Sequence, residues 1–545
     1  MTQPLNQVLM RLTRRSETND PSKLVNTFVD VGHLFALLSS RDHQIFYGRR
    51  GTGKTHALLY LADKVQAEHD WAVYIDLRRL GSSGGIYADE SLPLPERGTR
   101  LLLDALGRLH DAITDLVLEA SYTNENDFAA SMRILESLAD AVTQVRIEGS
   151  MEVNTSRSSA QEERRGSNAH LSCSPQSVGL GIGSSSSNAS GAKESVTLHQ
   201  AGVARHSVHF GNVSTVLERL VEALPCQRLW ILLDEWSTLP LELQPYLADL
   251  LRRSVFPVPG ITVKIGAIEQ RSTFRVQREQ GDYIGIEVGA DASADLDLDD
   301  FMVFGNDAEQ AKEFFRELLF RHVASEIEQK YEDYEKAPRN AQDFLRLAFT
   351  QTGVFEELVR AAEGVPRDAM NILSLAAQAA GNDAISMPNI RSAARKWYLR
   401  DKEQAVSANP DAALLLHWII DQVIGQKRTK GFLLDQEGVG HPLIGYLYDG
   451  RVLHIVRRGI SSRDRPGVRF LAYALDFGCY VHLTAAQAPT SLLAIEGDEG
   501  RKQLVDVPGD DYRSIRTALL DLSAFERSQR EPKQGQLLAD SERGA

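Results

Sequence analysis

The sequence predicts an α/β fold in which helices sandwich a parallel sheet, followed by a helical domain and a C-terminal module of short helices and strands. An apolar strand at 44–47 leads through a glycine-rich loop into a helix from Lys54 to about Glu68, with apolar residues at helical spacing. A continuous apolar run at 229–233 is typical of a strand buried on both faces of a parallel sheet. Helical patterns then extend from about residue 308 to residue 407.

Composition narrows the class of protein. The chain has 545 residues, 43% of them hydrophobic, which allows roughly two to four domains. A net charge of −14 argues against a protein that coats nucleic acid over its whole surface, but permits one basic module. The three cysteines are far apart and predict no zinc site or disulfide framework. With no signal peptide and no apolar stretch long enough to span a membrane, we expect a cytoplasmic protein.

The remaining elements follow in order along the chain. We expect a strand at 71–77, two helices within 97–147, helices at 213–224 and 241–253, a strand at 262–268, and an Asp- and Gly-rich loop at 281–300. Ser, Gly, Asn and Arg dominate at about 149–207, which predicts a disordered insertion or a loop that orders on a partner. The expected domains are a flexible arm (1–25), the α/β core with this insertion (26–305), a helical lid (306–407), a C-terminal domain (408–525) and a flexible tail (526–545).

The glycine-rich loop carries the first functional motif. It reads Gly48-Arg49-Arg50-Gly51-Thr52-Gly53-Lys54-Thr55 and matches G-x-x-x-x-G-K-[ST], the P-loop. Its backbone N–H groups would face phosphate oxygens, Lys54 would bring positive charge to the β- and γ-phosphates, and Thr55 would ligate Mg²⁺. The loop therefore predicts ATP and Mg²⁺ as ligands. His56 completes the set of residues at this site, although we expect its side chain to face outward on the first helical turn.

The second half of the site is the acidic pair that ends the apolar run. Asp234 and Glu235 follow Leu233 directly. Asp234 is expected to hold the Mg²⁺ shell and Glu235 to polarise the attacking water. Exposed acids at the end of an ordinary strand are the alternative, which the presence of the P-loop disfavours.

With both motifs present, the chain resembles the AAA+ ATPases, and in particular the origin-recognition type, over roughly residues 25–400. The signalling NTPases of the STAND group share both motifs and are a competing placement. The resemblance implies ATP hydrolysis, assembly into a homo-oligomer and a helical lid. It also implies a polar sensor after the strand at 262–268, at Glu269 or Gln270.

Two further arginine sites rest on the same resemblance. Gly364-Val365-Pro366-Arg367-Asp368 looks like the second sensor, where Arg367 reaches the γ-phosphate from a lid helix. A solvated arginine at a helix N-terminus is the alternative. Arg252 and Arg253 occupy a place that often holds an arginine finger acting on the neighbouring subunit. Basic residues favoured at a helix C-terminus explain them equally well.

The C-terminal region resembles the winged helix that follows the ATPase in origin-recognition-type proteins. We expect a helix at 412–424, a recognition-type helix at 442–451, and a hairpin that pairs 468–475 with 479–483. Residues 427–469 contain nine basic and four acidic residues, opposite in sign to the whole chain. This favours duplex DNA as a partner, with protein contacts as the alternative. The candidate DNA-binding residues are Lys427, Arg428, Lys430, Arg457, Arg458, Arg463 and Arg465.

Three functions remain open at this point. The first is an ATPase that couples nucleotide state to assembly and DNA binding. The second is a regulatory NTPase switch that controls an effector protein, for example in a bacterial defence system, without direct DNA binding. The third is a protein that binds ATP and barely hydrolyses it. No second catalytic centre is predicted from the sequence.

Overall fold

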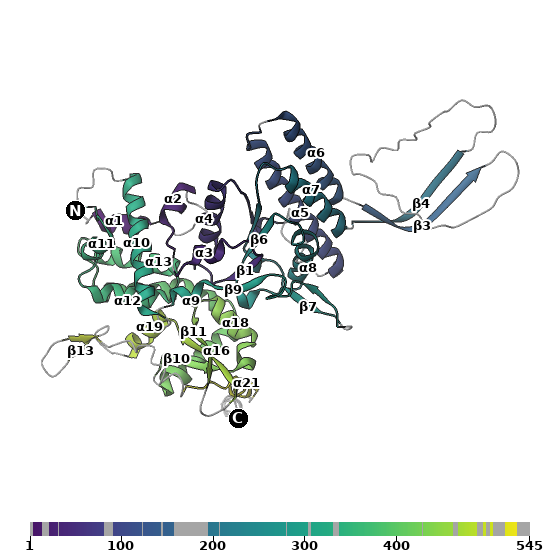
Figure 1. The fold of residues 1–545 in the computed structure, drawn as a ribbon. Coiled ribbons are helices and arrows are strands. Elements are labelled where there is room, and N and C mark those ends of the chain that lie inside the picture. Colours follow the sequence, from purple (N-terminus) through teal and green to yellow (C-terminus); the bar gives the residue numbers. More distant parts are fainter. Residues whose placement is uncertain are drawn as a thin grey trace, which may run out of the picture.

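A computed structural model shows a sheet-containing core, a helical domain and a C-terminal module (Figure 1). Among the described residues, no helix is long and apolar enough to cross a membrane. The structure describes residues 4–12, 21–30, 32–80, 91–122, 124–142, 145–156, 195–206, 208–278, 281–303, 307–330, 337–427, 429–461, 467–487, 494–496, 502–504 and 518–530.

The core is built on a parallel five-stranded sheet, which confirms the predicted α/β class. The strand order is β2-β5-β6-β1-β9. All residues of the two central strands β5 and β6 are buried, as the continuous apolar run at 229–233 predicted. The strands are β1 (Gln44–Tyr47), β2 (Trp71–Asp76), β5 (Leu229–Asp234), β6 (Ile261–Ala267) and β9 (Ser293–Asp297).

Strand β9 corrects the expectation of a loop at 281–300. Its sequence, Ser-Ala-Asp-Leu-Asp, carries no apolar run, yet it pairs in parallel with β1 at the sheet edge. A short hairpin of β7 (Arg275–Gln277) and β8 (Tyr283–Gly285) precedes it. An edge strand has one neighbour and one partly exposed face, so its strand character depends on pairing rather than on hydrophobic pattern.

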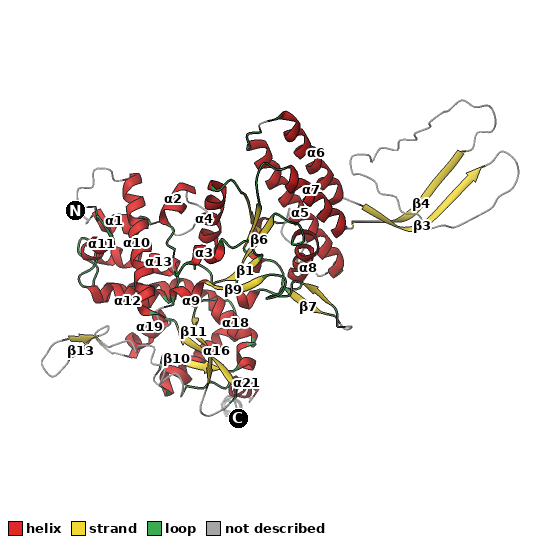
Figure 2. Cartoon of the chain, viewed as in Figure 1, coloured by secondary structure: helices red, strands yellow, loops and turns green. Residues whose placement is uncertain are grey.

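Successive side chains along a strand point to opposite faces of the sheet and pack in two separate apolar cores. Trp230 and Leu232 pack in the layer that contains α4 (Lys54–Ala67) and the lid, whereas Ile231 and Leu233 pack in the opposite layer. Helices therefore cover both faces of the sheet (Figure 2). The opposite layer is formed by α5 (Leu94–Glu119), α6 (Glu125–Val142), α7 (Phe210–Ala223) and α8 (Gln244–Leu250), which continues as a π-helical turn over Leu251–Val255.

The prediction of a flexible N-terminal arm is wrong for part of residues 1–25. Residues Pro4–Arg11 form helix α1, and Pro21–Thr27 form α2. Leu5, Val8 and Leu9 are fully buried in the lid core, at the spacing of one helix face. The Asn6 amide donates to the carbonyls of Gly381 and Asp383 at 2.9 and 3.0 Å. This helix is short and has no long apolar run, so its burial follows from the lid surface it packs on.

The lid is helical, as predicted. Its helices pack on α1 and on the sheet layer of α4 through one continuous core. They are α10 (Ala308–Lys330), α11 (Ala341–Ala348), α12 (Thr352–Ala362), α13 (Pro366–Ala380) and α14 (Met387–Trp397), which runs through a π-helical turn (Tyr398–Lys402) into α15 (Glu403–Ser407). Two short core helices complete this layer: α3 (Leu34–Leu38) lies against α4, and α9 (Leu298–Met302) lies against β1.

The insertion begins and ends as paired strands rather than as disordered chain. Strands β3 (Val145–Ser156) and β4 (Ser195–His206) form an antiparallel ribbon in continuous register. The ribbon extends away from the rest of the molecule (Figure 1). Residues 157–194 and 207, which complete the predicted disordered segment, lie outside the described residues.

The C-terminal module has a three-stranded antiparallel sheet of order β10-β12-β11. The predicted hairpin is wrong: 469–475 pairs with 453–461, whereas 479–483 belongs to a helix. The reason is Asp476, whose carboxylate accepts from the backbone N–H groups of Gly478 and Cys479 at 2.9 and 3.3 Å and so begins that helix instead of a turn. The elements are α16 (Pro410–Ile420), a π-helical turn (Asp421–Gln426), β10 (Gly431–Leu434), α17 (Gln436–Val439), α18 (Pro442–Asp449), β11 (Leu453–Ser461), β12 (Arg469–Leu475) and α19 (Phe477–Gln487).

Three elements beyond α19 are also described. A small ribbon pairs β13 (Ala494–Glu496) with β14 (Lys502–Leu504), and α21 (Leu522–Arg530) returns to the module core. Helix α21 thus takes the first residues of the predicted flexible tail, and 531–545 lie outside the described residues.

Candidate nucleotide site

The P-loop lies between β1 and α4, in the context the sequence predicted. Two of its glycines have left-handed backbone angles, with φ of 89° at Gly51 and 101° at Gly53. A Cβ atom at Gly51 would lie 2.9 Å from Cβ of Arg367. Glycine is therefore required at this position both for the curl of the loop and for the close approach of the lid.

A cavity of about 360 Å³ opens beside the loop. The loop residues 50–55 line one side, Glu235 and Arg367 line the others, and Phe28 and Leu318 belong to its apolar end. The size and the mixture of a polar loop with an apolar end suit a small organic anion.

The lysine of the motif lies inside the loop. Lys54 Nζ donates to the carbonyl oxygens of Gly48 and Arg49 at 2.8 and 3.1 Å. Burial lowers the pKa of Lys54, and the nearby carboxylates of Asp234 and Glu235 oppose that effect. The ammonium is thus held next to the backbone that would face phosphate.

The magnesium candidates meet although they are 179 positions apart in the chain. Thr55 Oγ1 donates to Asp234 Oδ2 at 2.5 Å, and Tyr74 OH donates to the same oxygen at 2.8 Å. The hydroxyl and the carboxylate are hard oxygen donors of the kind that Mg²⁺ takes, so these two residues fit the predicted ion. Tyr74 was missed from the sequence, because an alternating strand residue carries no motif.

Glu235 has a strained backbone. Its φ and ψ of 59° and 36° are left-handed, which is uncommon for a residue other than glycine. Its N–H donates to Asp234 Oδ1 at 2.8 Å, and its side chain lines the cavity. Such strain is concentrated at functional sites, and the catalytic role of this carboxylate stays a prediction.

Two arginines reach the cavity from different elements. Arg367, in the first turn of α13, donates its backbone N–H to the Gly51 carbonyl at 3.3 Å, so the lid touches the P-loop directly. Arg78 was missed: it follows β2, with Nη1 3.8 Å from Glu235 Oε1 and Nη2 2.8 Å from Asp76. The carboxyl ends of parallel strands meet at one edge, and this rule is the signal that identifies Arg78.

Two predicted residues occupy other positions than expected. The Arg49 side chain is buried and turned away from the cavity toward Asp299 and the C-terminal module, so only its backbone belongs to the loop surface. His56 does not face outward. Its Nε2 lies 2.6 Å from the Leu24 carbonyl and its ring packs edge-on against Phe28, where it lines the apolar end of the cavity.

The first-sensor candidates do not line the cavity. Glu269 forms an ion pair with Arg458 at 2.6 Å, and Gln270 donates to Tyr473 OH at 3.3 Å. Both side chains therefore face the C-terminal module. The turn that carries them continues β6 past the sheet edge and directs them away from the loop.

The arginine-finger candidates lie at the π-helical turn after α8. Both pair with Asp249 at 2.8 Å, and Arg252 also lies over the ring of Tyr283. Neither lines the cavity of its own chain. A finger acts on a neighbouring subunit, so this role stays a prediction.

Some basic residues of the C-terminal module pair with acids of the lid and core, whereas others are exposed. Lys430 is buried and pairs with Glu363 of the lid, and Arg458 pairs with Glu269 and Asp297 of the core. The Lys430 contact faces the inside of the molecule, which corrects its assignment to DNA, whereas the Arg458 side chain is 40% exposed and its role at DNA stays a prediction. Lys427 and Arg457 are exposed, and Arg428, Arg463 and Arg465 lie outside the described residues.

Comparison with known proteins gives one family match. Residues 13–164, which include the P-loop, match the family model described as ORC-CDC6-like. The match covers 152 of the 545 residues, so it is a likeness of this segment to that family. No curated protein matches the sequence.

One of the solved structures that match this chain does so at low similarity. It is the ORC1 protein of Aeropyrum pernix, solved in complex with DNA, at 13% identity and a TM-score of 0.30. The alignment covers 86% of this chain and 93% of that one. At a TM-score of this size, the likeness supports no conclusion about the function of the chain.

Proposed function

We propose that this protein is an ATPase that binds ATP and Mg²⁺ in the cavity beside the P-loop. The observation that carries the proposal is the contact of Thr55 with Asp234, which unites the two predicted halves of a nucleotide site at one cavity. The ORC-CDC6-like match over the P-loop segment supports the same function.

Each side chain around the cavity has a role in this proposal. Thr55 and Asp234 would hold Mg²⁺, which neutralises phosphate charge when it is bound. Lys54 binds the β- and γ-phosphates, and Glu235 orients the attacking water and takes its proton. Arg367 stabilises the charge on the γ-phosphate from the lid side.

The test is ATP hydrolysis by the full chain with Lys54→Ala and Glu235→Gln as variants, together with the affinity for a fluorescent ATP analogue. We expect Lys54→Ala to lose binding and Glu235→Gln to bind ATP without turnover. Unchanged turnover in Glu235→Gln would instead identify a protein that binds nucleotide and uses no carboxylate base.

We further propose that the C-terminal module is a winged helix that holds duplex DNA, and that nucleotide state controls both DNA binding and assembly into a homo-oligomer. Its element order of helix, strand, helix, helix, strand, strand supports the proposal, as does the pairing of the first strand with the third. A DNA-stimulated hydrolysis rate that falls with added salt is the expected result.

The second candidate is a nucleotide switch that controls an effector protein. The observation that favours it is the pairing of Lys430, Arg451 and Arg458 with acidic residues of the lid and core, which leaves less unpaired positive charge for DNA. A clear hydrolysis rate that is indifferent to duplex DNA at every salt concentration would support this function over the first.

A further inference from the structure

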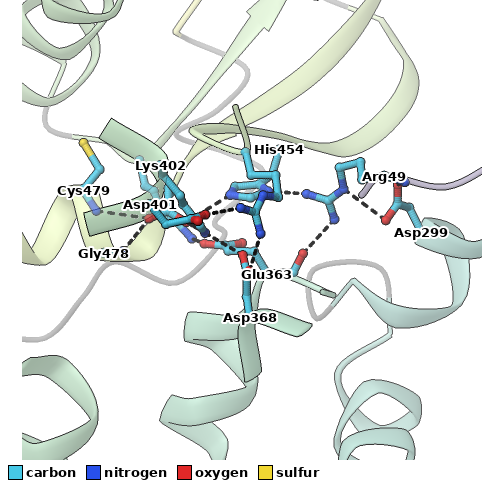
Figure 3. Close-up of polar contacts among 12 residues, drawn as sticks. Arg49, Asp299, Glu363, Asp368, Asp401, Lys402, His454, Gly478 and Cys479 are labelled. Carbon is cyan, nitrogen blue, oxygen red and sulfur yellow. Dashed lines mark hydrogen bonds and ion pairs between the residues drawn. The ribbon is translucent and has the colours of Figure 1, made fainter. Parts of the chain in front are cut away.

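A chain of buried polar groups connects the P-loop to the C-terminal module (Figure 3). It starts at Arg49, whose side chain is only 2% exposed. Arg49 Nε donates to Asp299 Oδ1 at 3.0 Å, its Nη2 donates to the Glu363 carbonyl at 2.8 Å, and its Nη1 meets Nδ1 of His454 on β11. The side chain of one loop residue thus contacts the core, the lid and the C-terminal module.

The arginine determines the state of the histidine. A guanidinium only donates, so Nδ1 of His454 is the acceptor and Nε2 carries the proton. Nε2 then donates to Asp476 Oδ2, at 3.2 Å. Burial lowers the pKa of His454 to about 3, which agrees with a neutral ring between Arg49 and Asp476.

The same network of buried polar groups continues from Asp476 to the lid. Lys402 Nζ lies 2.5 Å from Asp476 and 2.9 Å from Asp368 Oδ2, and all three side chains are almost completely buried. Arg451 Nη1 donates to the other oxygen of Asp368 at 2.5 Å. Asp368 is the neighbour of Arg367, which lines the nucleotide cavity. Both sides of the cavity, the loop and the lid arginine, are therefore anchored on one buried network.

The energetics make this network act as a unit. Removal of one partner of a buried ion pair leaves an uncompensated charge, which strongly destabilises the folded state, so loss of one member disturbs its neighbours. Apolar packing would be enough to attach the module, whereas directional contacts define the position of each partner.

We propose that Arg49 and His454 are positioning residues through which the C-terminal module sets the geometry of the P-loop relative to Arg367. The inference rests on the proposed nucleotide function. Because such coupling is reciprocal, a partner that displaces the module weakens nucleotide binding, and bound nucleotide favours the docked module.

The test compares His454→Ala and Arg49→Lys with a matched control in the full chain. The control is Tyr473→Phe, which removes the 3.3 Å hydrogen bond from Gln270, a contact between module and core outside the network. We expect both network variants to weaken binding of a fluorescent ATP analogue and to lower kcat/KM roughly tenfold, the order found for groups in one network. The control should stay within about twofold of wild type.

Two further readouts separate positioning from a general loss of structure. In the double variant the loss should equal that of the worse single variant, because both changes cut the same connection. Without nucleotide, amide hydrogen exchange at 48–53 should rise in the network variants and not in Tyr473→Phe. His454→Asn offers a milder change, since its amide oxygen can still accept from Arg49, and we expect it to recover much of the binding.

The outcomes decide the two proposals separately. If the network variants hydrolyse ATP and exchange their loop amides as Tyr473→Phe does, the positioning role is overturned while the ATPase stands. A wild-type chain without ATP binding would refute the proposed function. Loop exchange that rises only in the network variants would still support Arg49 and His454 as the residues that position the loop.

Discussion

The arrangement around Asp234 explains why a strand residue outside both motifs matters for the site. Asp234 Oδ2 accepts from Thr55 at 2.5 Å and from Tyr74 at 2.8 Å, and the carboxylate is fully buried. Hydrogen bonds to a ligating carboxylate fix its direction and tune its affinity for metal. Tyr74 reaches Asp234 because β2 and β5 are neighbours, with Asp76 opposite Asp234 in the register.

This contact predicts the effect of Tyr74→Phe. The ring is kept and the hydroxyl is lost, so Asp234 becomes less well oriented. We expect the Mg²⁺ concentration needed for half-maximal nucleotide binding to rise about 10-fold or more. The measurement is nucleotide affinity over a Mg²⁺ titration. Tyr60→Phe is the matched control, because Tyr60 stacks on Phe28 through its ring and does not touch Asp234. Equal Mg²⁺ curves for wild type and Tyr74→Phe would contradict this role.

A second residue-scale prediction concerns the buried His322, beside His56 and Lys23. Burial, and then the charges of His56 and Lys23, lower the pKa of His322 from 6.5 to about 3. Between these values the unfolded chain binds a proton that the folded chain does not, so stability rises with pH over this window. Acidification from pH 6.5 should therefore cost about 1.4 kcal/mol per pH unit from this residue.

The measurement is the midpoint of chemical denaturation as a function of pH. His322→Leu should show a shallower fall in stability toward low pH than wild type. Replacement of the exposed His209 by Gln is the control and should leave the slope unchanged. Parallel curves for wild type and His322→Leu would show that His322 does not stay neutral in the folded state.

At the scale of elements, the N-terminal helix is part of the lid. Leu9 of α1 is fully buried in the same core as α13, although it lies in a segment that reads as a polar arm. We expect Leu9→Ala to lower the free energy of unfolding by about 2–5 kcal/mol, because it leaves a cavity in a packed core. Because Leu118 on α5 is 59% exposed, Leu118→Ala should change stability by less than about 0.5 kcal/mol.

Thermal or urea unfolding of the two leucine variants checks this prediction. If Leu9→Ala unfolds at the same midpoint as wild type, α1 does not pack on the lid in solution. The connection has a functional side, because α13 carries Arg367 at its first turn. A loosened α1 should therefore also reduce nucleotide affinity.

At the scale of the whole molecule, the C-terminal module uses part of its positive charge to dock on the core. Arg457 and Arg458 are both exposed on the same strand, and Arg458 pairs with Glu269 and Asp297 of the core. If the module holds DNA, Arg457→Glu should weaken duplex binding and reduce the slope of log affinity against log salt by about one. Arg458→Glu should instead lower thermal stability, because it places a third acid beside two others.

Fluorescence anisotropy of a labelled duplex over a salt series distinguishes these two neighbouring arginines. Duplex affinity that is unchanged in Arg457→Glu would count against DNA contact by this strand and would favour the effector switch. A similar loss in both variants would mean that docking of the module, rather than charge, controls DNA binding.

The sequence by itself determined the parts of this protein whose pattern is local. The P-loop, its flanking strand and helix, and the apolar strand that ends in Asp234 and Glu235 each combine a motif with a hydrophobic period, and each is confirmed as an element of the fold. The resemblance placed Arg367 at the start of a helix, where the structure has it lining the cavity, and its sensor role stays a prediction. These features depend on contacts between residues that are near one another in the chain.

Only the tertiary structure decided features that depend on pairing between distant residues. Strand β9 has no apolar pattern and exists because β1 offers an edge. The helix after Asp476, the inward position of His56 and the docking of α1 likewise depend on neighbours far along the chain. Arg49 is the clearest case: the motif assigns it to the phosphate loop, yet its side chain is buried among groups 250, 314 and 405 positions away. A charged group goes where its burial is compensated, and the folded chain alone determines where its partners lie.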